Sequence, residues 1–315
     1  MMHLNIVERK RPAILIYLEA LLARTPSHRP EYPFLTEKVR RRTAGFAGES
    51  WFDKNWLHYE TSEPFRVIPD FQISSHQMDA LCIFPTFIAI IEIKNISGFI
   101  EMDHETRQLI RTKDGETIGM ANPDDQLYRH EKKIQQLTNY KIPVIGIVVF
   151  TNSTSVLKVS NIKRKVIHLS GLPYTLDSLI EQYRTSPKFD VHQLCSLFLT
   201  CQSPIKPYNP EPIPYPLLTG VFCPDCTFST MSYSRDFWRC PACRLKQRDA
   251  HLLALQDYRL LVGETISNRE FRQFTELRSR TNATLLLKRS GFQTIDTHKS
   301  LHYIIPEMDL RDKRK

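Results

Sequence analysis

Two neighbouring stretches decide the fold of this 315-residue chain: His76-Gln77-Met78-Asp79-Ala80-Leu81-Cys82-Ile83-Phe84 and Phe87-Ile88-Ala89-Ile90-Ile91-Glu92-Ile93-Lys94. Both are short, apolar and rich in β-branched or aromatic residues, which predicts two strands. Pro85-Thr86 between them favours a tight connection. An antiparallel hairpin of this kind would bring Asp79 close to the end of the second strand.

Three charged residues interrupt these apolar strands. Glu92 and Lys94 lie two residues apart, so they point to the same face of their strand. Ionised groups are costly to bury, so a buried strand rarely carries them without a use. Asp79, Glu92 and Lys94 together can hold a hard divalent cation and orient a water beside it. On the hairpin alone, an edge strand with a solvated polar face is an equal alternative.

Further residues between about 40 and 170 complete a pattern. Gly48-Glu49 lies in an expected helix, and Asn122-Pro123 with Gln126 opens another. In order with Asp79, and with Glu92-Ile93-Lys94 and Gly98, they resemble the NERD (nuclease-related) domain, which is similar to the PD-(D/E)xK nucleases. The ordered set carries the resemblance, because a Glu-x-Lys alone occurs in many proteins. Met78 stands where the superfamily is named for a proline.

The resemblance implies an α/β fold with a restriction-endonuclease-like mixed sheet flanked by helices. It also implies a metal-dependent nuclease that hydrolyses phosphodiester bonds, with DNA as the expected substrate. Asp79 and Glu92, joined by the backbone carbonyl of Ile93, would bind Mg²⁺ (or Mn²⁺).

The same resemblance assigns roles to three further side chains. Lys94 would orient or deprotonate the attacking water, or offset developing negative charge. Glu49 would complete the metal site or hold a second ion. Gln126 would hydrogen-bond the water or the Lys94 ammonium. A helix-surface carboxylate and a local cap are the respective alternatives for Glu49 and Gln126.

Four of the seven cysteines form two Cys-x-x-Cys pairs, Cys223-Pro224-Asp225-Cys226 and Cys240-Pro241-Ala242-Cys243. Two thiolate pairs separated by thirteen residues can close tetrahedrally around one Zn²⁺. Four thiolates leave no open position, so the zinc would be structural. Redox chemistry, the alternative, would not need two pairs. Such a zinc ribbon can contact nucleic acid or protein, and the motif does not choose between them.

The chain divides by composition into four parts. Residues 1–202 would form the nuclease-like domain and residues 217–249 the zinc ribbon. Between them, 203–216 carries six prolines, which predicts an extended, stiff linker. Residues 250–315 are basic and carry helix patterns over 252–261, from Ser267 onward and over 282–289, followed by a hairpin.

Three helices and a hairpin suggest a winged-helix domain, although other small helical domains share this pattern. Ser267 followed three residues later by Glu270 predicts a capped helix start, with Ser267 as the N-cap. The expected phosphate contacts are Arg278, Arg280, Lys288 and Arg289, with Lys299 on the wing. A solvated basic face is an equal alternative for each.

The remaining elements follow from periodicity and turn residues. Helices are expected at 13–23, at 34–57 with a break near Gly45–Gly48, at 124–137 and at 176–183. Strands are expected at 65–71, 78–84, 88–94, 144–150 and 166–169, with a hairpin over 98–119 that turns at 113–116.

Composition favours a polyanionic partner. Lys and Arg number 43 against 34 Asp and Glu, which leaves a net charge of +9. No apolar run reaches the ~18 residues needed to cross a bilayer, and the cysteine pattern does not resemble a secreted disulfide framework. We therefore expect a cytoplasmic protein that binds nucleic acid and no membrane. A non-catalytic nucleic-acid or partner-binding protein with a nuclease-like core is the alternative function, and a zinc-ribbon adaptor that binds only protein is more distant.

Overall fold

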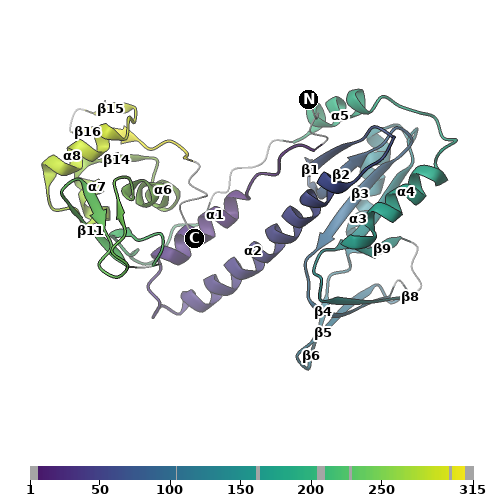
Figure 1. The fold of residues 1–315 in the computed structure, drawn as a ribbon, viewed down its shortest axis with the longest axis horizontal. Helices are drawn as coiled ribbons and strands as arrows, with labels where there is room; N and C mark the ends of the chain where they lie inside the picture. The colour runs from purple at the N-terminus through teal and green to yellow at the C-terminus, as the bar shows by residue number, and fades with distance from the viewer. Residues whose placement is uncertain are drawn as a thin grey trace. The chain divides into compact units, whose positions relative to one another are not determined.

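The computed structural model describes residues 6–103, 105–160, 164–203, 210–226, 229–297 and 300–308 (Figure 1). It divides into two compact units, 1–11 with 42–207 and 12–41 with 208–315. Helix α2 (Glu31–Asn55) contains one of the division points. The predicted linker prolines Pro204 and Pro207 and the predicted wing residue Lys299 lie outside the described residues.

The first unit is built on a five-stranded mixed sheet of order β1-β2-β3-β7-β9. The first three strands pair antiparallel, and β3, β7 and β9 pair parallel. This confirms the predicted mixed α/β sheet. The strands are β1 (Arg66–Ile73), β2 (His76–Ile83), β3 (Ile88–Lys94), β7 (Val144–Phe150) and β9 (Lys165–His168).

Strand β3 lies in the middle of this sheet and is buried on both faces. Ile88 and Ile90 belong to one apolar cluster, whereas Ala89 and Ile91 belong to the other, as the alternation of a strand requires. Helices α3 (Pro123–Leu137) and α5 (Val191–Cys201) contribute to the first cluster. Helix α4 (Leu172–Gln182) and the end of α2 contribute to the second. Covering both faces excludes water from β3 up to its last residues.

Helix α2 runs without the break expected near Gly45–Gly48, so that prediction is wrong. Glycine weakens a helix interior, but packing can override this preference. A Cβ added at Gly48 would lie 2.5 Å from the Cβ of Asn95 and 2.7 Å from Oγ1 of Thr151. Asn95 also donates a hydrogen bond of 2.7 Å to the carbonyl of Ala44. The helix therefore approaches the ends of β3 and β7 at a distance that only glycine allows.

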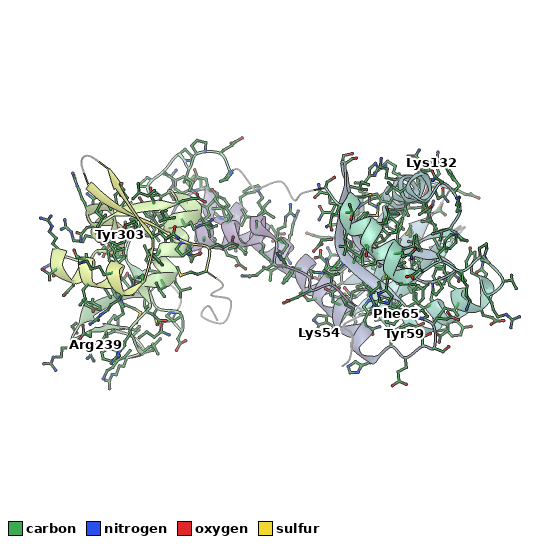
Figure 2. All side chains as sticks on the ribbon, turned by 90° about the horizontal axis from the view of Figure 1, so that it is seen from above. Lys54, Tyr59, Phe65, Lys132, Arg239 and Tyr303 are labelled. Carbon is green, nitrogen blue, oxygen red and sulfur yellow. The ribbon has the colours of Figure 1, made fainter. Side chains whose placement is uncertain are left out.

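An aromatic cluster lies beyond the end of α2. The short 3₁₀ helix η1 (Trp56–His58) leads into it. The ring centroids of Tyr59 and Phe65 lie 5.8 Å apart, and Figure 2 shows the two side chains next to each other. Trp56 packs on both rings, which fixes the C-terminal end of α2 against the sheet.

A second, four-stranded sheet of order β6-β5-β4-β8 extends the first unit. A single hairpin was expected over 98–119, whereas the structure has the three strands β4, β5 and β6 there. The fourth strand of this sheet, β8, was not predicted. The turn was placed correctly, because Asp114 and Gly115 both have positive φ, as a type I′ turn requires. The strands are β4 (Gly98–Asp103), β5 (Gln108–Lys113), β6 (Glu116–Met120) and β8 (Ser155–Ser160).

The second unit joins four small strands to a helical part. The small strands, which carry the cysteine pairs at their ends, are β10 (Val221–Phe222), β11 (Thr230–Ser234), β12 (Phe237–Arg239) and β13 (Lys246–Gln247). The helical part has helices α6 (His251–Leu261), α7 (Asn268–Thr275) and α8 (Arg280–Arg289), and strands β14 (Thr265–Ser267), β15 (Thr294–Thr297) and β16 (Ser300–Ile304).

The helical part matches the three helices and hairpin expected from the sequence. Its sheet has the order β14-β16-β15, so β14 is an additional strand beside the hairpin. The predicted capping box is present, because Ser267 accepts from the amide of Glu270 and the Glu270 carboxylate accepts from the amide of Ser267.

Helix α1 (Ala13–Arg24) packs within the second unit through a buried arginine. Arg24 is 1% exposed, and its Nε lies 2.9 Å from the Asp257 carboxylate on α6. Its Nη1 donates to the carbonyl of Gly220 at 2.7 Å. The guanidinium also lies over the rings of Phe222 and Phe274. A buried charge requires such partners, so α1 has a defined position in this unit.

The close approach at Gly48 gives a test with a matched control. We expect Gly48→Ala to lower the free energy of unfolding of the first unit by about 1–3 kcal/mol, because the added methyl group overpacks the site. Gly45→Ala in the same helix meets no atom within 4 Å and should instead stabilise by about 0.5–1 kcal/mol. Urea unfolding followed by tryptophan fluorescence measures both. Equal stabilities for the two variants would contradict the packing argument.

Candidate active site and metal centre

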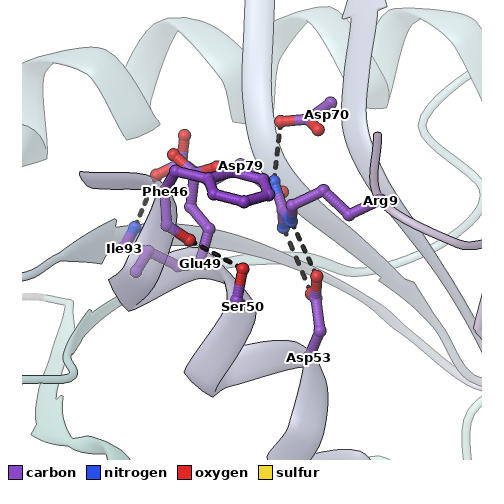
Figure 3. Close-up of polar contacts among 8 residues, drawn as sticks. All are labelled: Arg9, Phe46, Glu49, Ser50, Asp53, Asp70, Asp79 and Ile93. Atoms are coloured by element: carbon purple, nitrogen blue, oxygen red, sulfur yellow. Dashed lines mark hydrogen bonds and ion pairs between the residues drawn. The ribbon is translucent and has the colours of Figure 1, made fainter. Parts of the chain in front are cut away.

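The predicted hairpin brings Asp79 to the end of β3. Oδ2 of Asp79 accepts a hydrogen bond of 2.7 Å from the backbone amide of Ile93, the residue that follows Glu92 (Figure 3). Burial raises the pKa of Asp79, while the Ile93 amide and the charges of Lys94 and Arg9 oppose this effect. The structure thus brings Asp79 into direct contact with the Glu92-Ile93-Lys94 segment.

Glu92 and Lys94 form an ion pair on one face of β3. Nζ of Lys94 lies 2.7 Å from Oε1 of Glu92, whose side chain is only 3% exposed, whereas that of Lys94 is 26% exposed. Oε2 of Glu92 is buried and has no hydrogen-bond partner among the described residues. Burial, and next the negative charge of Asp79, raise the pKa of Glu92 to about 7. Oε2 of Glu92 is therefore the oxygen of this ion pair that remains available to a further partner.

The side chains of β1 and β2 change the sheet face to which they point at Asp70 and Asp79, which lie where the register of the two strands is interrupted between Pro69↔Ala80 and Phe71↔Met78. Ile68 and Phe71 share one apolar cluster although they are three residues apart, and so do Met78 and Leu81. Regular alternation would place such residues on opposite faces. Asp70, at this switch, has φ of 50°, a left-handed conformation that is uncommon for residues other than glycine. The irregularity lets two acidic side chains lie at the same place in an otherwise apolar sheet.

Glu49 reaches the site from α2, directly after the close contact of Gly48. Its Oε2 lies 3.2 Å from Nη1 of Arg9. Burial is the main cause that raises the pKa of Glu49 to about 7, and the nearby charges of Asp79 and Asp70 act in the same direction. The adjacent positions of Gly48 and Glu49 therefore have a structural reason. Gly48 lets α2 lie close to Asn95 and Thr151. This places Glu49 within reach of Arg9.

Arg9 is a site residue that sequence reasoning missed. Its Nε lies 2.7 Å from the Asp53 carboxylate and its Nη1 lies 2.7 Å from that of Asp70. Its Nη2 donates to the backbone carbonyl of Asp79 at 2.8 Å. The pairing of Val7 with Val67 at the start of β1 holds this segment in place. No local signal marks Arg9, which is one of several basic residues near the N-terminus.

Gln126 forms no hydrogen bond with the other candidates among the described residues. It lies in the first turn of α3, half-buried, and its side chain makes no hydrogen bond to another described residue. Asn122, from the same motif, caps this helix by accepting from the amide of Asp124 at 2.9 Å, and Pro123 takes the first helical position. The motif therefore sets the start of α3, which packs on β3 and β7.

The residues at the end of β3 fit a divalent cation. Hard cations such as Mg²⁺ prefer carboxylate and carbonyl oxygens. Asp79 and Glu92 supply two carboxylates, and Oε2 of Glu92 is buried without a partner among the described residues. Lys94 alone neutralises only part of this negative charge.

The four cysteines of the second unit come together as the spacing predicted. Their sulfur atoms all lie within 4.8 Å of one another, and those of Cys223 and Cys243 are 3.7 Å apart. Among the described residues, no second group of three or more His, Cys, Asp or Glu side chains is gathered as closely. The set can hold one zinc ion.

The thiols of this set differ in their pKa values. Backbone amides, first that of Cys243, lower the pKa of Cys240 to about 7. Hydrogen bonding to Cys243 is the main cause that raises the pKa of Cys226 to about 12. Four neighbouring sulfurs cannot all carry negative charge without a positive partner, and a bound Zn²⁺ would supply it.

The cysteine set predicts one zinc per chain. Elemental analysis of reduced protein, dialysed without added metal, should give close to one equivalent. Cys240→Ser should lose this zinc and destabilise the second unit, because the metal replaces much of a hydrophobic core in such a small sheet. Cys201→Ser, outside the set, is the matched control and should keep the zinc. Less than about half an equivalent in the unmodified protein would contradict a resident zinc.

Comparisons with known proteins give one match, which covers part of the first unit. No helix among the described residues is long and apolar enough to cross a membrane. No curated protein and no solved structure matches the chain. One family model, described as the nuclease-related domain (NERD), matches residues 44–151, which include Glu49, Asp79, Glu92 and Lys94. Residues 44–151 are therefore a nuclease-related domain, as the ordered motifs indicated.

Proposed function

We propose that this protein is a metal-dependent nuclease that hydrolyses phosphodiester bonds in DNA. The observation that carries the proposal is the buried carboxylate of Glu92. One of its oxygens is bound by Lys94 and the other has no partner among the described residues, beside a second carboxylate from Asp79. Such a group is costly to bury unless a cation binds it.

Phosphodiester hydrolysis requires an attacking water, neutralisation of charge on the phosphoryl oxygens and a leaving alkoxide. Asp79, Glu92 and the carbonyl of Ile93 would hold Mg²⁺ or Mn²⁺. A bound divalent cation neutralises the phosphate and lowers the pKa of a coordinated water.

Lys94 acts beside this pair of carboxylates. Its Nζ donates to Glu92 at 2.7 Å, and its partial exposure leaves the other two ammonium protons able to face substrate or water. There it can orient the attacking water or offset negative charge that develops in the transition state. Gln126, which forms no hydrogen bond with these groups, would act only after substrate binds.

The second unit would bind the nucleic acid. Arg278, Arg280 and Lys288 are exposed on or beside α8, and so is Arg289, which pairs with Asp236. Exposed cations on one helix can neutralise successive phosphates. The structural zinc would hold the small strands that precede this helical part.

The catalytic proposal predicts the effect of two substitutions. Asp79→Asn and Lys94→Met should each reduce metal-dependent cleavage by at least about 10²-fold, because each removes a charge that stabilises the transition state. Both keep the approximate size of the side chain, so the fold should remain. Cleavage of supercoiled plasmid with Mg²⁺ or Mn²⁺, with and without chelator, measures the rate.

Lys158→Met is the matched control for these variants. Lys158 lies on β8 and also pairs with a glutamate, Glu101 at 2.6 Å, but it is 62% exposed. Its replacement should leave cleavage unchanged. If Lys94→Met cut at the wild-type rate, its catalytic assignment would be wrong. An unmodified protein that binds DNA but never cuts it would favour the non-catalytic binding protein.

The DNA-binding role of α8 predicts a change in salt dependence. Arg280→Gln with Lys288→Gln should weaken DNA binding and reduce the slope of log K against log salt by about 0.9 for each phosphate that is no longer neutralised. Arg40→Gln with Arg41→Gln removes two exposed charges that Glu37 already neutralises in part, and should change the slope less. Fluorescence anisotropy with labelled duplex at several salt concentrations measures both. Equal slopes for the two double variants would remove α8 from the interface.

A further inference from the structure

Arg9 lies where three carboxylates converge. Its guanidinium binds Asp53 through Nε and Nη2, and Asp70 and Glu49 through Nη1. The remaining contact of Nη2 goes to the backbone carbonyl of Asp79, a candidate metal ligand. Figure 3 shows the guanidinium between Asp70 and Asp53, with Asp79 beside it. One cation thus gathers acidic side chains from α2 and β1 and the backbone of β2.

This arginine is buried as deeply as a core residue. Its side chain is 3% exposed, whereas those of its carboxylate partners range from 18% to 26%. A buried guanidinium is stable only when its donors are satisfied, and here each nitrogen has an acceptor. The arrangement resembles the way in which a metal ion is surrounded by oxygen ligands, with donor hydrogens in place of coordination bonds.

The site nevertheless contains two distinct acidic groups. Asp79 and Glu92 lie at the end of β3, where Oε2 of Glu92 is buried without a partner among the described residues. Glu49, Asp53 and Asp70 instead face Arg9. Of these five described carboxylates, only those of the first group include an oxygen that is buried and still lacks a cation.

We propose that Arg9 takes the place of a second metal ion, so that the site binds one divalent cation through Asp79 and Glu92. Glu49 is then an acceptor for Arg9 and not a metal ligand. Arg9 is a positioning residue, because it fixes the backbone of Asp79 through the 2.8 Å hydrogen bond to its carbonyl. The inference rests on the proposed function and decides between the two roles that Glu49 could have in it.

A purely structural role is the competing explanation. Arg9 could simply tie the N-terminal segment to α2 and to the β1-β2 pair. In that case its removal would lower stability but would not change the number of ions bound. The number of divalent cations per chain therefore separates the two explanations, and it does not depend on cleavage.

The experiment is a Mn²⁺ titration of the full-length, zinc-loaded protein, with free Mn²⁺ measured by electron paramagnetic resonance. We expect one Mn²⁺ for the unmodified chain. Arg9→Met frees Glu49, Asp53 and Asp70 and should add a second equivalent, and combining it with Glu49→Gln should remove that equivalent again. Arg9→Lys keeps a positive charge at this position and should bind one.

A second arm tests the proposal even if Arg9→Met does not fold. Glu49→Gln alone should still bind one Mn²⁺, whereas Asp79→Asn should bind none. Loss of Mn²⁺ from Glu49→Gln, two ions in the unmodified chain, or one ion in folded Arg9→Met would each overturn the proposal. If the unmodified protein cuts DNA and binds one ion while Arg9→Met does the same, only this inference fails. If it binds no Mn²⁺ and does not cut, the proposed function fails as well.

Discussion

The candidate site depends on the burial of β3 between two paired neighbours. Pairing with β2 on one side and β7 on the other, together with the covering helices, removes water from both of its faces. Glu92, at 2% exposure, therefore holds its carboxyl group where little water reaches it. A carboxylate in such surroundings must be protonated, paired or bound to a metal. The chemistry of the site follows from this constraint, because Lys94 satisfies only one of the two oxygens.

The acidic character of the site is concentrated by backbone irregularity as well as by burial. Asp70 and Asp79 lie where the pairing of β1 with β2 is interrupted, and Asp70 adopts positive φ there. Residues held in rarely populated conformations are typical of functional sites, where the surrounding structure compensates for the strain. Arg9 neutralises part of the negative charge of Glu49, Asp53 and Asp70. Burial nevertheless raises the pKa values of Glu49 and Asp70, and the charge of Arg9 only opposes this effect.

Most of the elements and site residues that could be predicted are those whose pattern involves residues close in sequence. The strand Val144–Phe150, the hairpin that holds Asp79 and Glu92, and the cysteine pairs were each visible as a local pattern. Tertiary contacts decided the rest. The helix break at Gly45–Gly48 was wrong because packing on Asn95 and Thr151 outweighs the low helix propensity of glycine. Arg9 was missed since its partners lie 40 to 70 residues away.

The central claim is that Asp79 and Glu92 together bind a divalent cation at the end of β3. The most direct measurement is anomalous X-ray scattering from crystals of the full-length protein soaked in Mn²⁺. The account predicts one anomalous peak within coordination distance of Asp79 and of Oε2 of Glu92, about 2.0–2.6 Å from each oxygen. The absence of a peak there, or a peak between Glu49 and Asp70 instead, would contradict it.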